Sequence, residues 1–156
     1  MGYTHYLYRA PELEPAHYTA FAAEARTLLR DIDAILVRDH GTGLAGPQGT
    51  GAVVVTDELV SFNGAAPSDY ETCRIERSVA PDDYRRGDPD DHGRVFSFCK
   101  TAYKPYDAAV TAVYALAVDH FGAAVAADSD GGPEAIEEGR QLASRLLGRQ
   151  LRGAAA

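Results

Sequence analysis

The sequence lacks tryptophan, contains only two cysteines and carries fewer basic than acidic side chains. Two cysteines are too few for a disulfide framework, so we expect both thiols to be reduced. The net charge of -8 argues against a nucleic-acid partner, because binding to a phosphate backbone requires a basic surface. No window holds the roughly 20 apolar residues of a membrane helix, and the first residues lack the regions of a signal peptide. We therefore predict a cytoplasmic protein with no membrane partner.

The composition that is present is that of a globular protein. The chain has 156 residues, of which 46% are hydrophobic and 24% charged. A chain of this length forms one core and buries roughly 68–70% of its unfolded surface. We expect a single domain over residues 1–150 and a frayed tail over residues 151–156.

Alternating and helical spacings of apolar residues divide the chain into short elements. The alternation predicts strands at residues 2–8, 53–56, 59–62, 71–77, 94–101 and 123–127. The helical spacing predicts helices from Pro15, over residues 108–121 with an apolar stripe, and from Pro133 up to Gly148. Adjacent strands joined by short turns favour antiparallel pairing. The expected fold is α+β, with a single mixed, mainly antiparallel sheet and about three helices packed on one face.

Two segments allow alternative interpretations. Ala34 to Arg38 fits either the last turns of the first helix or a short strand. Ser78 to Gly93 is almost wholly polar and fits either a functional lid or a disordered loop. Asn63 and Gly64 tolerate positive φ and are expected to begin a turn.

The stretch from Arg94 to Asp107 joins an apolar strand to a helix and concentrates reactive side chains. Alternation places Cys99 on one face of this strand and Lys100 on the other. Cys99 is a candidate nucleophile if Lys100, Lys104 or protonated His5 favours its thiolate. The alternative is a small buried hydrophobe, since free cysteine is among the most buried residue types.

The same junction is a candidate anion-binding site. The start of a helix offers free N–H groups and a positive dipole end, and lysines beside it favour a phosphate or carboxylate. The candidate binding residues at the junction are Lys100, Thr101, Lys104 and Tyr106. The competing interpretation is that Lys100 pairs with Glu71 or Glu76 on a neighbouring strand and that Asp107 merely favours the helix dipole.

Further polar residues are assigned to the site with less support from local pattern. His5, the one histidine in a regular apolar strand, and Glu71 are candidate proton-transfer groups, against scaffold roles for both. Other candidate binding residues are Asn63, Arg74, Ser129 and Asp130. The sequence Asp128-Ser-Asp-Gly is not a haloacid dehalogenase motif, because that fold needs most of its chain after the motif; capping of the last helix is the favoured interpretation. Since no histidine pair has zinc spacing, we expect no metal and no cofactor.

With these blocks in view, the chain resembles a family of small uncharacterised bacterial and phage proteins that begin Met-Gly-Tyr-Thr-His-Tyr. The likeness spans nearly the whole chain. It is carried by Gly2 to Tyr6, Phe62-Asn-Gly64, Glu71-Thr72, Phe98-Cys-Lys-Thr-Ala102, Lys104-Pro-Tyr-Asp107 and Ser129-Asp-Gly131. Relatives tend to have Trp where this chain has Leu7. The resemblance implies no particular activity.

Three hypotheses follow for function. The first is a small hydrolase or transferase for a compact anionic molecule, with Cys99 as nucleophile and His5 or Glu71 moving the proton. The second is a non-catalytic binder of small molecules, or a phage–host interaction protein, that uses the same lysines and tyrosines. The third is a homodimer surface made by Tyr3, Tyr6, Tyr8 and the hairpin near residues 52–62.

Overall fold

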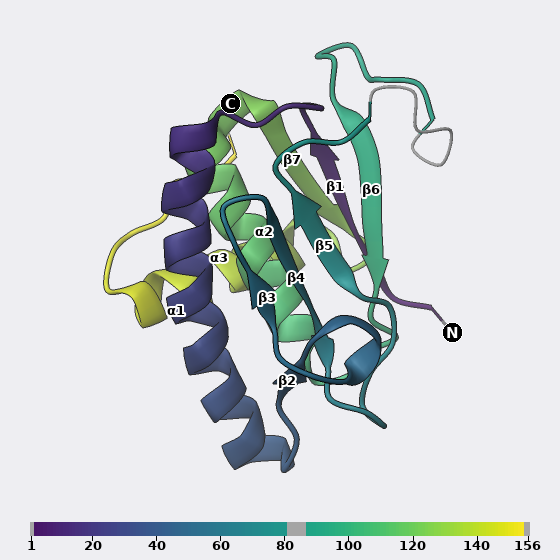
Figure 1. Ribbon diagram of the computed structural model, residues 1–156, viewed down its shortest axis with the longest axis vertical. Coiled ribbons are helices and arrows are strands. Elements are labelled where there is room, and N and C mark those ends of the chain that lie inside the picture. The colour runs from purple at the N-terminus through teal and green to yellow at the C-terminus, as the bar shows by residue number, and fades with distance from the viewer. Residues whose placement is uncertain (1, 81–86, 155–156) are drawn as a thin grey trace.

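A computed structural model describes residues 2–80 and 87–154, and it confirms the α+β class (Figure 1). Its three helices are α1 (Pro15–His40), α2 (Asp107–Phe121) and α3 (Pro133–Leu147). Its strands are β1 (Thr4–Arg9), β2 (Leu44–Ala45), β3 (Val54–Val55), β4 (Leu59–Gly64), β5 (Cys73–Glu76), β6 (Val95–Lys100) and β7 (Val125–Ser129). Short 3₁₀ turns, Pro47–Gly49 and Gly122–Ala124, precede β3 and β7.

The strands form two sheets where one was expected. The first has the order β6-β1-β7, and the second the order β2-β4-β3 with β5 also paired to β4. Every strand pair in the described part of the chain is antiparallel. The sheets meet where the Glu71 N–H donates to the Lys100 carbonyl. The alternation of apolar residues within a strand indicates only which face is buried. It could not show that β6 pairs with the distant β1 and not with β5.

The alternation expected for β1 and β6 is confirmed. His5 and Leu7 face the core from β1, and Cys99 faces it from β6, each fully buried. Because β1 is the central strand, His5 lies opposite Cys99 on one side and opposite Ser129 on the other. Residues directly opposite in an antiparallel pair have neighbouring side chains, so three polar residues meet at one end of this sheet.

Helix α1 includes the segment that the sequence left open between helix and strand. The segment Ala34 to Arg38 is helical, and the helix continues to His40. Pro15 opens the helix as expected, with the Glu14 carboxylate accepting from the Ala16 and His17 N–H groups. Gly41, with φ 72°, ends it in the left-handed region that glycine adopts without strain.

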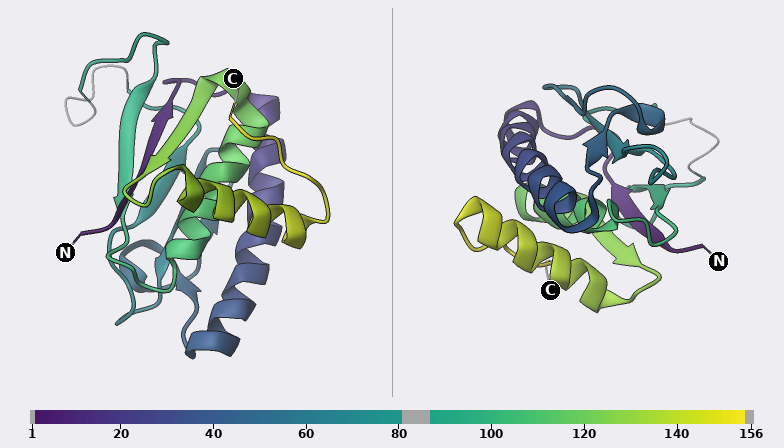
Figure 2. Two further views of the ribbon diagram at one scale, coloured as in Figure 1. Left: turned by 180° about the vertical axis from the view of Figure 1, so that it is seen from behind. Right: turned by 90° about the horizontal axis from the view of Figure 1, so that it is seen from below.

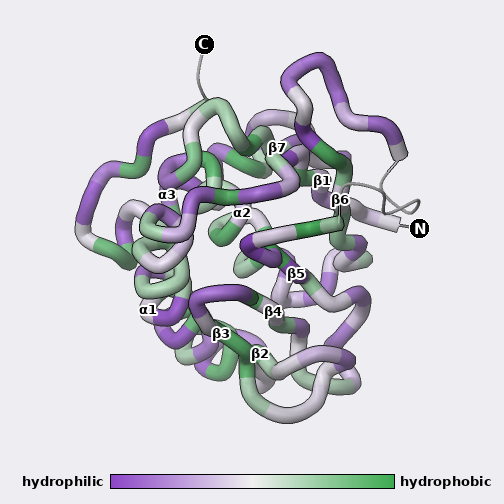
Figure 3. Tube along the Cα trace, turned by 45° about the horizontal axis from the view of Figure 1, so that its top comes forward, coloured by the Kyte–Doolittle hydropathy of each residue, from purple (hydrophilic) through white to green (hydrophobic). Residues whose placement is uncertain are grey.

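Helix α2 occupies the middle of the molecule and is buried on all sides. From the sequence, only one apolar stripe on this helix was expected to be buried. Every residue from Ala109 to Asp119 is buried. Helices α1 and α3 both pack against α2, and its remaining side contacts β1 and β7 (Figure 2). The hydropathy of the trace agrees, since α2 is mainly hydrophobic while the segment leading into β6 is hydrophilic (Figure 3). No helix among the described residues is both long and apolar enough to cross a bilayer.

Two local predictions were wrong, and a third, the lid or disordered loop at residues 78–93, stays a prediction. Asn63 and Gly64 do not begin a turn but end β4, paired with β2. The last helix is not capped by the Asp128–Asp130 segment, because its N-cap is Gly132 and no side chain caps it. In the predicted loop Ser78 to Gly93, residues 81–86 lie outside the described residues, and residues 90–94 form a turn closed by Asp90 and Arg94.

The C-terminal segment returns to the core instead of fraying at residue 151. Leu151 is buried, and the Arg152 N–H donates to Asp119. The Arg149 guanidinium reaches both Glu24 on α1, at 2.6 Å, and Asp119 on α2, also at 2.6 Å. The segment after α3 therefore ties the other two helices together.

The close crossing of α2 and α3 depends on Gly139. A Cβ at this position would lie 2.5 Å from the Thr111 backbone of α2, which has no room to move. Alanine normally stabilises a helix interior by about 1 kcal/mol relative to glycine. We expect the opposite sign for Gly139→Ala, a loss of about 1–3 kcal/mol in the free energy of unfolding, measured by urea denaturation. Gly153→Ala, where nothing lies within 4 Å, is the control and should be neutral. Equal stability of the two variants would contradict the crossing.

The Arg149 ion pairs should make stability depend on pH. The Arg149 hydrogen bond lowers the pKa of Glu24, and burial of Asp119 is outweighed by bonds from Arg149 and Arg152 that lower its pKa. Carboxylates with depressed folded pKa values stabilise above their unfolded pKa, near 4, and lose that contribution as the pH falls through the folded pKa. Arg149→Gln should cost roughly 1–3 kcal/mol at pH 7, and the difference from the wild type should shrink below about pH 4. The exposed Arg38→Gln is the control, expected within about 0.5 kcal/mol of wild type. A difference that persists in acid would refute the pairing.

Candidate functional site

The centre of the candidate site is His5, whose two ring nitrogens both have side-chain partners. Its Nδ1 lies 2.8 Å from Ser129 Oγ, and its Nε2 lies 2.6 Å from Asp107 Oδ2. The Thr101 hydroxyl donates to the same Asp107 oxygen. His5 is fully buried, Ser129 is 8% exposed, and the Asp107 side chain is 26% exposed. We call Ser129, His5 and Asp107 the His5 network.

Each member is positioned by regular structure. His5 faces inward from the central strand, opposite Ser129 in the β1–β7 register. Asp107 is the first residue of α2, where an acidic side chain is favoured by the helix dipole. The Thr101 and Ala102 N–H groups both donate to the Tyr3 carbonyl, which fixes the turn that leads from β6 to α2. Sites held by strand and helix ends keep their geometry better than sites on loops.

Hydrogen-bond chemistry fixes the direction of the proton in this network. An ionised Asp107 only accepts, so His5 Nε2 must carry a proton. Ser129 Oγ accepts from the Gly131 N–H at 3.0 Å, and a neutral ring with its proton on Nε2 leaves Nδ1 bare, able only to accept from the Ser129 hydroxyl. In the neutral ring Ser129 is therefore the donor and His5 the acceptor, the arrangement that general-base activation of a hydroxyl requires.

Tyr3 and Tyr103 lie beside the network. Their rings stack with centroids 4.1 Å apart, and Tyr3 meets His5 edge-on at 5.0 Å. Burial raises the pKa of Tyr3, although a hydrogen bond with Ser129 acts in the other direction. A Cβ at Gly131 would overlap the Tyr3 oxygen, so glycine there allows the phenol to reach the serine. Tyr103 is 65% exposed and forms the solvent side of this stack.

The turn under Tyr103 is strained. Ala102 and Tyr103 are consecutive non-glycine residues with φ of 51° and 61°. Such conformations cost of order 1 kcal/mol or more each and persist only where the surroundings hold them. Non-glycine residues in this region concentrate at active sites and ligand clamps, which supports a functional role for the turn.

Asp130 is close to the network but has a different task. Its carboxylate accepts from the Thr4 N–H at 3.0 Å and from the Tyr6 hydroxyl at 2.7 Å. Its own N–H donates to the Thr4 carbonyl. Asp130 therefore fastens the end of β7 to β1, and each of its carboxylate oxygens accepts one hydrogen bond from β1.

Cys99 lies opposite His5 in the β1–β6 register, but its environment is that of a core residue. The thiol is fully buried and donates to the Glu71 carbonyl at 3.5 Å. Burial and a hydrogen bond with Cys99 raise the pKa of its neighbour Cys73, and burial beside both thiols raises the pKa of Tyr114. These neighbours offer no base to form a thiolate, and the nitrogens of His5 are engaged elsewhere. The structure gives no support to Cys99 as nucleophile.

Glu71 and Tyr106 hold the two sheets together. The Glu71 carboxylate accepts from the Lys100 N–H at 2.7 Å, and the Tyr106 hydroxyl donates to the Glu71 carbonyl at 2.6 Å. Glu71 thus binds the main chain of Lys100, where pairing with its ammonium group was one expectation. Burial raises the pKa of Tyr106 well above its usual range, so its hydroxyl stays protonated. Both residues act as connectors at the junction.

At the expected anion-binding site at the start of α2, N–H groups are already bonded to carbonyl groups of the protein. The Asp107 N–H donates to the Lys104 carbonyl, and the Ala109 N–H donates to the Tyr106 carbonyl. These bonds consume N–H groups that a free helix terminus would offer to a ligand. The Lys100 ammonium lies over the Tyr70 ring, 5.8 Å from its centroid. Lys104 is half-buried in the turn that precedes Asp107.

Asn63 and Arg74 lie apart from the network. Asn63 is fully buried; its amide donates to the Tyr70 carbonyl and the Thr72 hydroxyl, and its oxygen accepts from the Tyr70 N–H. These bonds shape the segment between β4 and β5. Arg74 is exposed on β5 and pairs with Glu76. The structure does not bring either residue to the His5 network.

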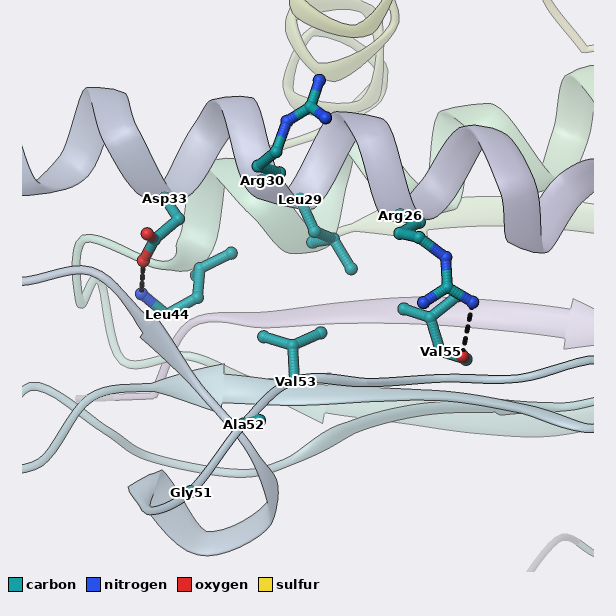
Figure 4. A pocket seen from close by; sticks show the side chains of 9 residues that line it. All are labelled: Arg26, Leu29, Arg30, Asp33, Leu44, Gly51, Ala52, Val53 and Val55. Atoms are coloured by element: carbon teal, nitrogen blue, oxygen red, sulfur yellow. Dashed lines mark hydrogen bonds between the residues drawn. The ribbon is translucent and has the colours of Figure 1, made fainter.

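Two other features have the outline of a site. Glu24, Asp119 and His120 offer three ligand atoms within 4.8 Å of one another, but the Arg149 guanidinium already pairs with both carboxylates. A hollow of about 290 Å³ lies between α1 and residues 44–55 (Figure 4). Two of its charged side chains bind the main chain: Arg26 donates to the Val55 carbonyl, and Asp33 accepts from the Leu44 N–H. Both features are structural connections.

Sequence reasoning selected His5, Ser129, Thr101 and Asp130 but assigned Asp107 only to the helix dipole and Tyr3 only to a dimer surface. Asp107 lies in the first turn of the helix that follows β6, and this position is the signal that could have placed it near His5. That signal requires knowing that β1 lies between β6 and β7, which is a long-range pairing.

The burial of both cysteines yields a direct test of their role. We expect neither Cys73 nor Cys99 to react with a water-soluble thiol reagent in the native protein, and both to react after unfolding, because both are fully buried. Ellman's reagent with and without guanidinium measures this. Val37→Cys, at a position that is 51% exposed, is the positive control. Rapid labelling of Cys99 in the folded protein would restore its candidacy as nucleophile.

Comparisons with known proteins do not assign the chain to a family. No family model matches the chain, and neither a curated protein nor a solved structure matches it. The resemblance to small bacterial and phage proteins therefore stays a prediction, and the contacts around His5 carry the functional argument alone.

Proposed function

We propose that the protein is a small hydrolase or transferase that acts on a compact anionic molecule through Ser129, His5 and Asp107. The single observation that carries the proposal is that one fully buried imidazole contacts a serine hydroxyl at 2.8 Å and a carboxylate at 2.6 Å. A nucleophile, a base and an orienting acid in this order form a triad, which is recognised by geometry and not by order in the chain. The nucleophile is thus Ser129 in place of Cys99.

The chemistry follows from the positions of the protons. As Ser129 Oγ forms a bond to the electrophilic centre of the substrate, its proton passes to His5 Nδ1. The imidazolium that forms is stabilised by Asp107, which Thr101 holds in place. The proton then passes from Nδ1 to the leaving group as that bond breaks. Nδ1 exchanges the proton with the serine and Nε2 donates to the aspartate, and either ring nitrogen of a histidine can take either role.

Substrate entry is proposed on the Tyr103 side. Ser129 is only slightly exposed, and Tyr3, stacked under the exposed Tyr103, lies beside its hydroxyl. Outward rotation of these rings would uncover the hydroxyl, and the strained turn at Ala102 and Tyr103 is suited to such a change. Lys104 favours a substrate of negative charge.

The second candidate is the non-catalytic binder, either of small molecules or in a phage–host interaction. The observation that favours it is that the Ser129 hydroxyl is almost enclosed, as in a buried network that only fixes β1, β7 and α2. In this case Tyr103 and Lys104 bind a ligand and no covalent step occurs. Cytoplasmic location is part of both proposals.

A fluorophosphonate probe tests the proposal without knowledge of the substrate, because it reacts with serines that a histidine activates. We expect the wild type to gain one adduct at Ser129, located by mass spectrometry of its peptides. Ser129→Ala should remove the adduct, and Asp107→Asn should slow labelling by about a thousandfold or more, because the amide favours the wrong tautomer of His5.

The matched controls are Ser97→Ala, a serine of β6 that donates to the Leu7 carbonyl, and Cys99→Ala. Both should label at the wild-type rate. Circular dichroism and thermal melting establish that each variant is folded. A folded wild type that gains no adduct would overturn the triad and favour the binder.

A further inference from the structure

The outer face of the first sheet carries an aromatic patch. Tyr6 and Tyr8 point outward from β1, alternating with the buried His5 and Leu7. Phe96 lies 5.9 Å from the Tyr6 ring and 5.7 Å from the Phe98 ring. The Phe98 side of the patch faces solvent, since Phe98 is 50% exposed. The three strands form an outer wall of the molecule (Figure 2). A contiguous aromatic surface on a sheet marks an interaction site.

The patch is asymmetric across the sheet. The register aligns side chains in rows that run from β6 through β1 to β7. Each row has a bulky or basic residue on β6, a residue of β1 in the middle, and a small or acidic residue on the β7 side. The first two rows are Phe96–Tyr8–Ala126 and Phe98–Tyr6–Asp128. The third is Lys100–Thr4, and Asp130 continues it on the β7 side, where its N–H donates to the Thr4 carbonyl.

We propose that this face is the interface of a symmetric dimer, with a second copy of the chain packed sheet against sheet and the two-fold axis parallel to β1. This axis places β6 of one copy over β7 of the other. Phe96 then meets the small Ala126 of the second copy, and the Lys100 ammonium approaches Asp130 of the second copy. An axis across the strands would instead stack β6 on β6, with phenylalanine on phenylalanine and no acid facing Lys100.

Shape and charge both favour a copy of this chain over other occupants. Sheets that pack face to face keep their strands within about 30° of each other, as this axis requires. A two-fold interface must be complementary to itself, and the bulky edge and the small edge satisfy that condition. Bases also stack on aromatic sheet faces, but the chain carries a net charge of -8, which opposes a nucleic acid. The inference is independent of the His5 network.

The test compares two exposed apolar side chains on different faces. Phe98 is 50% exposed in the patch, and Val37 is 51% exposed on α1. Sedimentation equilibrium of the wild type should give the mass of a dimer. Phe98→Glu should raise the dimer dissociation constant by about 30-fold or more, the loss typical of an aromatic hot spot, and Val37→Glu should not change it. A wild type that is monomeric at the highest soluble concentration, or a Phe98→Glu variant that stays dimeric, would overturn the proposal.

Cross-linking tests the direction of the axis. One copy carries Phe98→Cys and the other Asp128→Cys, and a short bismaleimide spans packed sheets about 10 Å apart. The native thiols are buried and do not compete. The mixture of the two variants should cross-link, whereas Phe98→Cys alone should not. Cross-linking of Phe98→Cys with itself would replace the proposed axis by the one that stacks β6 on β6.

Discussion

The need to satisfy both nitrogens of a fully buried histidine organises this end of the molecule. A polar group without a hydrogen-bond partner in the core costs about 1–3 kcal/mol in the free energy of unfolding. The central strand β1 carries His5 between two edge strands, and the nitrogens take one partner from β7 and one from the start of α2. The places where β7 ends and α2 begins are thereby tied to one ring.

The same constraint accounts for the strain nearby. To bring Asp107 to His5, the chain must turn sharply after β6, and it does so with two left-handed residues that are not glycine. The Tyr3 carbonyl accepts from two N–H groups of that turn, and Tyr3 stacks on Tyr103. A stiff network in the core beside a strained turn at the surface is the arrangement expected where a buried group must become accessible to a ligand.

How far the sequence predicted this structure depends on the range of the interaction. The α+β class, the burial faces of β1 and β6, and the starts of α1 and α3 at Pro15 and Pro133 follow from local periodicity and from the geometry of proline. The division into two sheets and the central position of α2 do not, because pairing of distant strands leaves no local pattern. Ser129 was selected within a short polar motif, but its partnership with His5 spans 124 positions of the chain. Cys99 shows the reverse case, a reactive residue type that the fold buries completely in the core.

The tautomer of His5 tests the central claim most directly. Ring ¹⁵N chemical shifts of His5, assigned by comparison with a His5→Gln variant, report which nitrogen carries the proton. The account predicts a proton on Nε2 toward Asp107 and a bare Nδ1 that accepts from Ser129. A proton on Nδ1 would make the serine an acceptor, and His5 would then be a structural connection without the capacity to activate it.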